Sequence, residues 1–317
     1  MEIRIPRLFD GKTVKDYLYR NGVSRAMIIR LKKREDGILL NGQHVTVRGI
    51  LRENDFLSLA IDDRPEDENP DLHPVEMPLD ILFENDDLIA VNKPAGIPTH
   101  PAIGHFEDTL ANGLSYYFSS RGIPFCFRAI NRLDRNTSGV VLVAKNQISA
   151  AKLTALLQAG KIKKRYLAIL NGHPVPSDGE IDRPIRRQKE SIILRETCKP
   201  DTPGAKPALT RYQTAASSER LSAVIAEPVT GRTHQLRVHF ASIGCPLVGD
   251  GLYGTAETEP SEADRQLSRH ALHALSLTVE DEPPLSFSAP LPDDLRRLCR
   301  GNHLSVDNIT EKQKAGF

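Results

Sequence analysis

From about residue 81 onward, the chain is divided into short apolar runs that are separated by glycine, proline and polar residues. Runs of this length, rich in β-branched residues, are typical of β-strands. Many strands with few helices between them predict a mixed α/β (α+β) domain on a largely antiparallel sheet. The predicted strands are Ile81–Glu84, Leu88–Asn92, Val140–Ala144, Tyr166–Leu170, Ile192–Arg195, Ala208–Thr214, Leu221–Glu227 and Ala274–Val279.

Two segments of this region have a helical pattern of apolar residues instead. Ser149–Ala159 carries leucines at helical spacing and ends before Gly160, and Thr233–Ile243 has a similar pattern before Gly244. Glycine directly after the last apolar position is a common helix stop. Each segment is therefore predicted to form one amphipathic helix.

The N-terminal region has a different order of patterns. Thr13 is a typical N-cap for a short helix that stops at Asn21-Gly22, and a second helix is predicted from Ser24. Asn41-Gly42 is a dipeptide that favours a type I′ hairpin turn. We therefore predict two helices, then a hairpin over Ile38–Leu40 and His44–Val47, then a strand over Phe56–Ile61.

The second predicted helix is basic, although the whole chain has a formal net charge of only +1. So small a total is weak evidence for nucleic-acid binding, and the local clustering matters more. A basic helix face is often no more than a solvated surface, which is the alternative interpretation. The candidate RNA-binding residues on this helix are Ser24, Arg25, Arg30, Lys32 and Lys33.

This order of elements, with the sequence SRAMIIRLKKREDGILLNGQHV, resembles the S4 RNA-binding domain. The resemblance spans roughly residues 13–61 and implies a small module that presents a basic helical face to structured RNA. The acids and prolines that follow are typical of an interdomain linker. We expect an S4-like domain at 1–61, a linker at 62–78, a larger domain at 79–300 and a loose polar tail at 301–317.

Length and composition agree with two domains. The chain has 317 residues, 39% of them hydrophobic and 26% charged, which is typical of a globular protein larger than one usual core. Because it shows neither a membrane-spanning apolar run nor a signal-peptide pattern, we expect a cytoplasmic protein. Four separated cysteines without a CxxC pair predict reduced thiols, most of them buried. No heptad pattern or long apolar edge calls for a partner, so a monomer is expected.

The most informative segment is Phe127–Lys145, with the sequence FRAINRLDRNTSGVVLVAK. Here a polar loop precedes a fully apolar strand, and loops held by a rigid sheet often carry reactive groups. Asp134 lies between Arg132 and Arg135, which either keep its carboxylate ionised in a site or form surface ion pairs. On this local physics alone, a structural ion pair is the better interpretation.

The string NRLDRNTSG closely resembles the HRLDRDTSG signature of the RluA family of pseudouridine synthases. Three further segments are similar to the family in the expected order: VNKPAGIPTHP, KKRYLAIL and GRTHQLRVHFASIGCPLVGDGLYG. The resemblance covers nearly all of residues 81–290, including RHALHALSL. Asn131 and Asn136 depart from the family's usual His and Asp, which affects local loop contacts and leaves the Arg-x-Asp core intact.

The resemblance implies an enzyme that isomerises particular uridines in RNA to pseudouridine, without a cofactor or a metal. Asp134 matches the family's nucleophile, Arg237 the arginine held against it, and Tyr166 the tyrosine that packs on the target base. Attack on ribose C1′, attack on base C6 and removal of a ribose proton all remain open for Asp134. Because a stacked uridine must be flipped out to react, Arg132 matches the arginine that fills the vacated place.

RNA is the expected partner. In the basic run that precedes Tyr166, Lys164 and Arg165 are candidates for binding phosphates, and Lys93 is a weaker one. An S4-like module favours large structured RNA, so ribosomal RNA is preferred over transfer RNA.

Other classes of function have weaker support. The closely spaced histidine pairs, His234 with His239 and His270 with His273, lack the HExxH arrangement or the cysteines typical of a metal hydrolase. Neither a GxSxG nor a GxxxxGK[ST] motif occurs. The non-enzyme alternative is an RNA-binding or ribosome-assembly factor with an inactive synthase domain. The presence of all three motif residues together argues against it.

Overall fold

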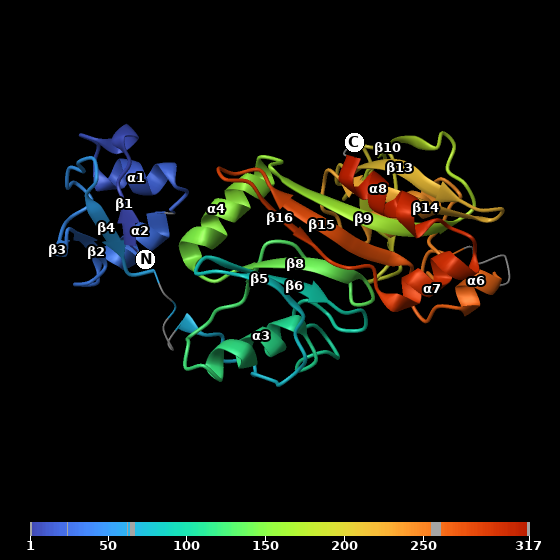
Figure 1. Ribbon diagram of the computed structural model, residues 1–317, viewed down its shortest axis with the longest axis horizontal. Coiled ribbons are helices and arrows are strands. Elements are labelled where there is room, and N and C mark those ends of the chain that lie inside the picture. Colours follow the sequence, from blue (N-terminus) through green and yellow to red (C-terminus); the bar gives the residue numbers. More distant parts are fainter. Residues whose placement is uncertain (1, 24, 62, 64–66, 255–260, 316–317) are drawn as a thin grey trace. The chain divides into compact units, whose positions relative to one another are not determined.

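The computed structural model of the chain describes residues 2–23, 25–61, 63, 67–254 and 261–315. Figure 1 shows the helices and strands coloured along the sequence. The chain divides into two compact units, each made of several segments. Unit 1 comprises Met1–Ala90, His100–Asn131 and Leu142–Ala159, and unit 2 comprises Val91–Thr99, Arg132–Val141 and Gly160–Phe317. This division does not follow the predicted boundaries at residues 61 and 78, so the S4-like domain and its limits stay a prediction.

The N-terminal part of unit 1 has the predicted order of two helices and a hairpin. Thr13 and Asp16 exchange hydrogen bonds at the start of α1 (Val14–Arg20), a capping box that satisfies free N–H groups of the first turn. Asn41 and Gly42 both have positive φ between β2 (Ile38–Leu40) and β3 (Gln43–His44), as a type I′ turn requires. The other elements are β1 (Glu2–Arg4), the 3-10 helix η1 (Arg7–Phe9), α2 (Arg25–Lys32) and β4 (Phe56–Leu59), and the sheet order is β1-β4-β2-β3.

One apolar core holds these elements together. Leu18 of α1, Leu31 of α2 and Leu57 of β4 are each at most 1% exposed and belong to the same cluster. Full burial of a leucine contributes about 1.5 to 3 kcal/mol. The apolar stripes read from the sequence therefore do face a shared core.

The acidic segment that was predicted to be a linker is anchored within unit 1. Asp63, with a fully buried side chain, accepts two hydrogen bonds from Arg128 and one from the N–H of Cys126. Asp67 forms an ion pair with Arg30. A bidentate guanidinium offsets the high cost of burying a carboxylate. The described part of this segment is therefore fixed by its charges.

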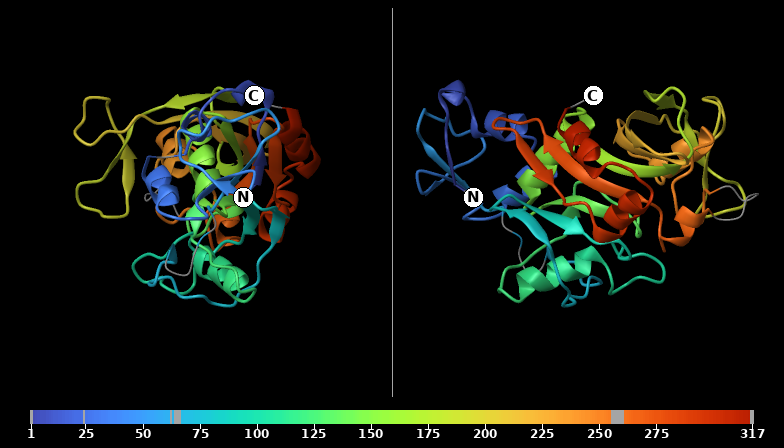
Figure 2. Two further views of the ribbon diagram at one scale, coloured as in Figure 1. Left: turned by 90° about the vertical axis from the view of Figure 1, so that its left-hand side faces the viewer. Right: turned by 45° about the vertical axis from the view of Figure 1, so that its right-hand side comes forward.

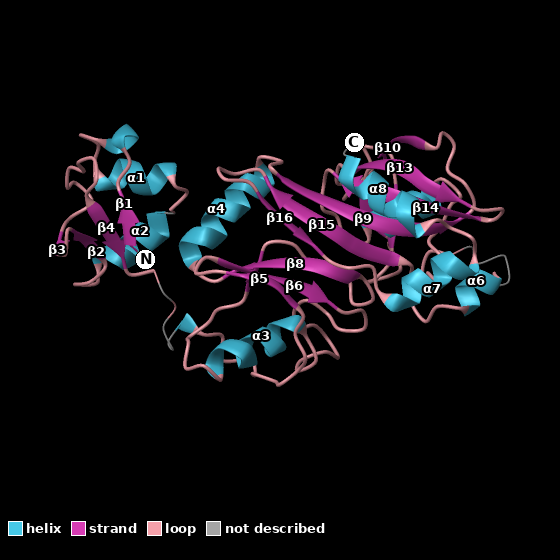
Figure 3. Ribbon diagram, in the orientation of Figure 1, coloured by secondary structure: helices cyan, strands magenta, loops and turns pink. Residues whose placement is uncertain are grey.

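Ten strands form one large, mostly antiparallel sheet (Figure 3). They are β5 (Ile81–Glu84), β6 (Leu88–Lys93), β7 (Arg128–Ala129), β8 (Ser138–Ala144), β9 (Ile162–Asn171), β10 (Asp178–Asp182), β13 (Leu209–Ser217), β14 (Leu221–Pro228), β15 (Leu272–Val279) and β16 (Leu285–Ser288). The order is β10-β13-β14-β9-β15-β8-β6-β5, with β16 beside β15 and β7 beside β8. The predicted fold class is therefore confirmed.

The remaining elements lie outside this sheet. Both predicted helices are present, as α4 (Gln147–Gln158) and α5 (Gln235–Ser242). The sequence patterns did not predict α3 (Leu110–Ser119), in which an Asn-Gly pair interrupts the apolar stripe. In the described residues, no helix is long and apolar enough to cross a membrane. The other elements are the strands β11 (Ile185–Arg187) and β12 (Arg195–Thr197) and the helices α6 (Glu262–Arg265), α7 (Asp293–Gly301) and α8 (Val306–Ala315).

The predicted strand Ile192–Arg195 is mostly wrong. Ile192 and Ile193 are 76% and 54% exposed in the turn between β11 and β12. The Ser191 hydroxyl accepts hydrogen bonds from the N–H groups of Ile193 and Leu194, and such a side-chain acceptor competes with strand pairing. Figure 2 shows the segment around this hairpin extending away from the large sheet in the left view.

The two faces of the sheet in unit 2 differ in what covers them. Leu167 and Ile169 of β9 share an apolar cluster with Leu304 and Ile309, and α8 contacts β13 and β14. Because side chains alternate along a strand, Tyr166 of β9 points to the opposite face. The C-terminal helices therefore close the back of the strand that carries Tyr166.

This packing corrects the prediction of a loose polar tail from residue 301. Leu304 and Ile309 are 3% and 2% exposed, and α8 reaches Ala315. The tail reads as polar because its apolar residues are few, but those few are gathered on one face. A short amphipathic helix gains most of its stability from such tertiary packing.

We expect Leu304→Ala to lower the free energy of unfolding by about 2 to 4 kcal/mol, because it leaves a cavity against β9 and β14. Urea unfolding followed by circular dichroism measures this loss. The matched control is Glu311→Ala, an exposed position on α8, which we expect to change stability by less than about 0.5 kcal/mol. Equal midpoints for Leu304→Ala and the unmodified protein would show that the C-terminal segment does not stabilise the sheet.

Candidate active site

Asp134 lies in the loop between β7 and β8, and its side chain is 27% exposed. Its carbonyl oxygen accepts a hydrogen bond of 3.0 Å from the N–H of Thr137, which closes a tight turn. The Thr99 hydroxyl donates to the carbonyl of Leu133 and accepts from the N–H of the same residue, at 3.0 and 3.1 Å. The backbone on both sides of Asp134 is therefore fixed, which limits the directions that its short side chain takes.

Lys93 holds the same loop from the interior. Its side chain is 0% exposed, and Nζ donates to the carbonyl oxygens of Pro94, Ile97 and Arg135 at 2.8, 2.8 and 3.1 Å. Burial lowers the pKa of Lys93 to about 7, and the Asp134 carboxylate opposes this shift. Three carbonyl acceptors match the three N–H groups of the charged form, which is the form we assign at neutral pH. A lysine buried in this way does not reach RNA, so its predicted contact with phosphates is wrong.

Two buried histidines fix the start of β8. His270 Nε2 lies 2.8 Å from Thr137 Oγ1, and His273 Nδ1 lies 2.8 Å from Ser138 Oγ. Burial lowers the pKa of both imidazoles to about 4, so both are neutral at pH 7. In the part of the chain that the structure describes, no three His, Cys, Asp or Glu side chains are grouped as a metal ion would need.

The two departures from the family motif make structural contacts. Asn131 Oδ1 accepts a hydrogen bond of 2.9 Å from the N–H of Leu142. The carbonyl oxygen of Asn136 accepts one of 3.1 Å from Arg269. Both residues therefore help to shape the segments that flank the Asp134 loop.

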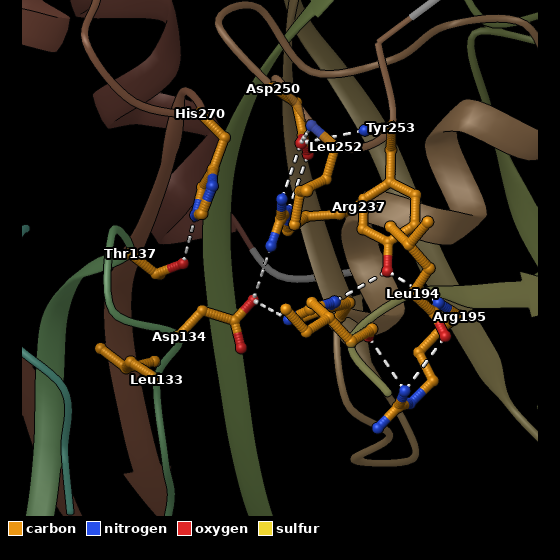
Figure 4. A network of polar contacts seen from close by, with 12 residues as sticks. Leu133, Asp134, Thr137, Leu194, Arg195, Arg237, Asp250, Leu252, Tyr253 and His270 are labelled. Atoms are coloured by element: carbon orange, nitrogen blue, oxygen red, sulfur yellow. Dashed lines mark hydrogen bonds and ion pairs between the residues drawn. The ribbon is translucent and has the colours of Figure 1, made fainter. Parts of the chain in front are cut away.

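Arg237 faces Asp134 from α5, with Nη1 at 3.6 Å from Oδ2 (Figure 4). Its Nε and Nη2 donate to the two carboxylate oxygens of Asp250, each at 2.7 Å. Burial raises the pKa of Asp250, but the hydrogen bonds and the charge of Arg237, with smaller contributions from other neighbours, together lower it below its usual value. The ring of Tyr253 lies 4.9 Å from the guanidinium carbon. Because Asp250 holds two of its three nitrogens, Arg237 is left with Nη1 directed at Asp134.

His234 approaches the same carboxylate oxygen as Arg237. It precedes α5 with φ 57° and ψ 19°, its Nε2 lies 4.0 Å from Asp134 Oδ2, and its Nδ1 lies 2.7 Å from the Tyr253 hydroxyl. Burial lowers the pKa of His234, while the charge of Asp134 opposes this. From the sequence, His234 was considered only as a weakly supported metal ligand, and Asp250 and Tyr253 were not identified. The available signal was that all three lie in one motif segment, GRTHQLR to GDGLYG.

Tyr166 projects from the middle of the sheet beside this cluster. It pairs with Ala226 of β14 and Ala274 of β15, and it is 7% exposed. Burial, with a contribution from the Asp134 charge, raises the pKa of its hydroxyl, which is therefore protonated at neutral pH. The structure thus brings Asp134, Arg237 and Tyr166 together within unit 2.

The remaining substrate-binding candidates are near the site but less constrained. Arg132 is exposed on the Asp134 loop. Lys164 is on β9, where burial lowers its pKa, and the neighbouring Arg165 lies 3.9 Å from Glu227. Their contacts with RNA stay predictions.

The candidate RNA-binding residues of α2 are in unit 1. Arg25, Lys32 and Lys33 are exposed, whereas Arg30 is paired with Asp67. Ser24 lies outside the described residues. Their role also stays a prediction.

The buried imidazoles should make the unfolding free energy depend on pH. Each has a pKa of about 4 when folded and about 6.5 when unfolded, so the unfolded chain binds more protons between these values. The stability that the two neutral imidazoles contribute is present above pH 6.5 and is lost as the pH falls toward 4. Between pH 7 and pH 5, we expect each histidine to lower the free energy of unfolding by roughly 1 to 2 kcal/mol.

Urea unfolding at both pH values tests this expectation. The double variant His270→Gln/His273→Gln should lose less stability between pH 7 and 5 than the unmodified protein. His44→Gln, at an exposed position, is the control and should leave the pH dependence unchanged. Parallel pH profiles for the double variant and the unmodified protein would contradict the assignment.

Replacing Lys93 by methionine keeps the length of the side chain and removes three hydrogen bonds. Because three buried carbonyls then lose a donor, we expect the free energy of unfolding to fall by about 2 to 4 kcal/mol. Lys33→Met, at an exposed position on the other unit, should change stability by less than about 0.5 kcal/mol. Thermal or urea unfolding decides, and an unchanged midpoint for Lys93→Met would refute the anchoring role.

Comparisons with known proteins give one consistent result. Residues 87–242 match a family model described as RNA pseudouridylate synthase. The chain is 34% identical over 295 residues to an uncharacterized RNA pseudouridine synthase of Bacillus subtilis, YjbO, covering 92% of this chain and 100% of that protein. It is 37% identical over 239 residues to ribosomal large subunit pseudouridine synthase D of Nitrosomonas europaea, covering 74% of this chain and 68% of that protein.

A solved structure agrees with the sequence comparisons. Human RNA Pseudouridylate Synthase Domain Containing 4 superposes with a TM-score of 0.60 and 26% sequence identity, covering 72% of this chain and 94% of that one. Identity over most of two relatives, a matching family model and the four ordered motifs show that the chain belongs to the RluA family of RNA pseudouridine synthases.

Proposed function

We propose that this RNA pseudouridine synthase uses Asp134 as its nucleophile and acts on ribosomal RNA. One observation carries the assignment of Asp134: a partly exposed carboxylate faces a buried guanidinium that a second carboxylate holds in place. A reactive group has to be both reachable and oriented, and Asp134 meets both conditions. Relatives named as ribosomal large subunit pseudouridine synthases support the choice of RNA.

The isomerisation needs few chemical groups. The N1–C1′ bond of uridine breaks, the uracil turns, and a C5–C1′ bond forms, while C5 loses a proton and N1 gains one. The reaction involves no net oxidation or reduction. A carboxylate that engages the nucleoside covalently divides it into easier steps, and Asp134 supplies that carboxylate.

Arg237 orients Asp134 and compensates its negative charge. A carboxylate that loses water when RNA binds requires a cation nearby, because burying an unpaired charge is costly. Asp250 stops Arg237 from turning away, so the guanidinium is already in place before the substrate arrives. Such preorganisation avoids reorganising charges during the reaction.

The target uridine reaches this carboxylate only after it leaves its stack, at a cost of a few kcal/mol. Arg132, exposed on the Asp134 loop, fills the vacated place in the RNA. Tyr166 offers its ring to the flipped base, as aromatic side chains do in many RNA complexes.

Lys164, Arg165 and the basic face of α2 bind phosphates. The N-terminal region serves as an S4-like module that holds structured RNA, and the chain acts as a cytoplasmic monomer. These contacts with the RNA backbone add affinity without reading its sequence.

Asp134→Asn tests the catalytic assignment, because it keeps the shape of the side chain and removes its charge. With RNA tritiated at uridine C5, pseudouridine formation releases the label, and we expect release to fall by at least about 1000-fold. RNA affinity should stay within about threefold. Asp201→Asn, at an exposed position in unit 2, is the matched control and should be fully active. An active Asp134→Asn protein would exclude Asp134 as the nucleophile.

A pseudouridine map of RNA from cells that lack this gene identifies the substrate. Sites in ribosomal RNA should disappear and return with the intact gene but not with the Asp134→Asn version. Loss of sites in transfer RNA alone would refute the ribosomal assignment while leaving the activity in place.

A further inference from the structure

His234 adopts a left-handed backbone conformation that is uncommon for residues other than glycine. Its φ of 57° lies in the left-handed region, which costs a residue other than glycine or asparagine about 1 kcal/mol or more. Such strain persists when the surroundings impose it, and it is often found at functional sites. The conformation places the imidazole between Asp134 and Tyr253, with a side chain 13% exposed.

The hydrogen-bond chain favours one of the two neutral forms of the His234 imidazole. The N–H of Arg195 in β12 donates to the Tyr253 hydroxyl oxygen at 3.0 Å (Figure 4). This favours the arrangement in which the hydroxyl's own hydrogen points at His234 Nδ1, 2.7 Å away. A neutral imidazole that accepts at Nδ1 carries its hydrogen on Nε2.

The opposite side of the ring gives the same assignment independently. Nε2 faces a carboxylate oxygen of Asp134, and a lone pair there would be repelled by the negative charge, whereas an N–H is attracted. The charged groups whose fields act on this ring are Asp134, Arg237, Arg195 and Asp250. Burial keeps the imidazole neutral by lowering its pKa.

We infer that His234 is a positioning residue for the nucleophile, donating from Nε2 to Asp134 Oδ2 so that Oδ1 is the oxygen presented to the uridine. Both His234 and Arg237 approach Oδ2, at 4.0 and 3.6 Å. These distances exceed a hydrogen bond, and such contacts tighten when substrate binds and water leaves. The inference rests on the proposed role of Asp134 as nucleophile.

The same series of hydrogen bonds connects the site to the β11–β12 hairpin. Arg195 is the first residue of β12, and its backbone N–H sets the direction of the Tyr253 hydroxyl. Displacement of this strand would free the hydroxyl and with it the imidazole. The orientation of Asp134 therefore depends on a strand that belongs to a separate two-stranded sheet.

Two substitutions of His234 distinguish the role of its Nε2–H donor from the role of its left-handed backbone conformation. Asparagine suits the left-handed conformation and places an amide near Nδ1, but it is too short to reach Asp134. Glutamine is longer and places an N–H close to the position of Nε2. The measurement is the single-turnover rate of tritium release at saturating RNA, together with the RNA dissociation constant.

We expect His234→Asn to slow the single-turnover rate by about 10- to 100-fold, since a misplacement of about 1 Å can cost about 100-fold. RNA affinity and thermal unfolding should stay unchanged, and His234→Gln should recover most of the rate. Tyr253→Phe, which keeps the ring beneath Arg237, should also slow the reaction. In the double variant His234→Asn/Tyr253→Phe, the rate should fall little further, because both side chains act through one series of hydrogen bonds.

Three results would overturn the inference: full activity of His234→Asn, equal rates for the Asn and Gln variants, or a loss confined to RNA affinity. Asp134→Asn is measured in the same series. Activity in that variant would refute the proposed function itself, whereas an inactive Asp134→Asn with a fully active His234→Asn would refute only the role of His234.

Discussion

A single buried guanidinium, Arg237, connects two carboxylates of unequal accessibility. Asp250 has a fully buried side chain and two short bonds from Arg237, whereas Asp134 is partly exposed and 3.6 Å away. Removal of one partner from a buried ion pair typically costs about 3 to 5 kcal/mol, because the other charge is left uncompensated. The inner pair is therefore the fixed part of the arrangement. The outer carboxylate keeps the freedom that chemistry on a substrate requires.

The sheet allows this arrangement because its two faces serve different purposes. On β9, Leu167 and Ile169 enter the apolar cluster closed by the C-terminal helices, while Tyr166 projects toward Asp134. A strand buried on both faces moves little, so the aromatic ring and the carboxylate keep their separation. Lys93, Thr99, His270 and His273 fix the Asp134 loop from further points in unit 2.

Much of this could be predicted from sequence, and the failures have physical causes. Asp134, Arg237 and Tyr166 were identified by motif, and most strands were identified by their apolar runs. Lys93 was misassigned because a basic residue in a glycine-proline loop reads as exposed, and no local pattern reveals three carbonyls that converge on it. The other partners of Arg237, Asp250 and Tyr253, were missed for a similar reason. Long-range pairing decides which acid is buried, and the backbone conformation of His234 leaves no mark in composition.

The packing of the C-terminal segment also affects when the large sheet becomes fully folded during synthesis. Domains generally fold as the chain emerges from the ribosome, N-terminal parts first. Leu304 and Ile309, which close the back of β9, come after every strand of the large sheet in the sequence. The strand that carries Tyr166 therefore lacks part of its support until these residues have been translated. A nascent chain that already contains every motif but has not yet reached these residues would still have an unfinished core.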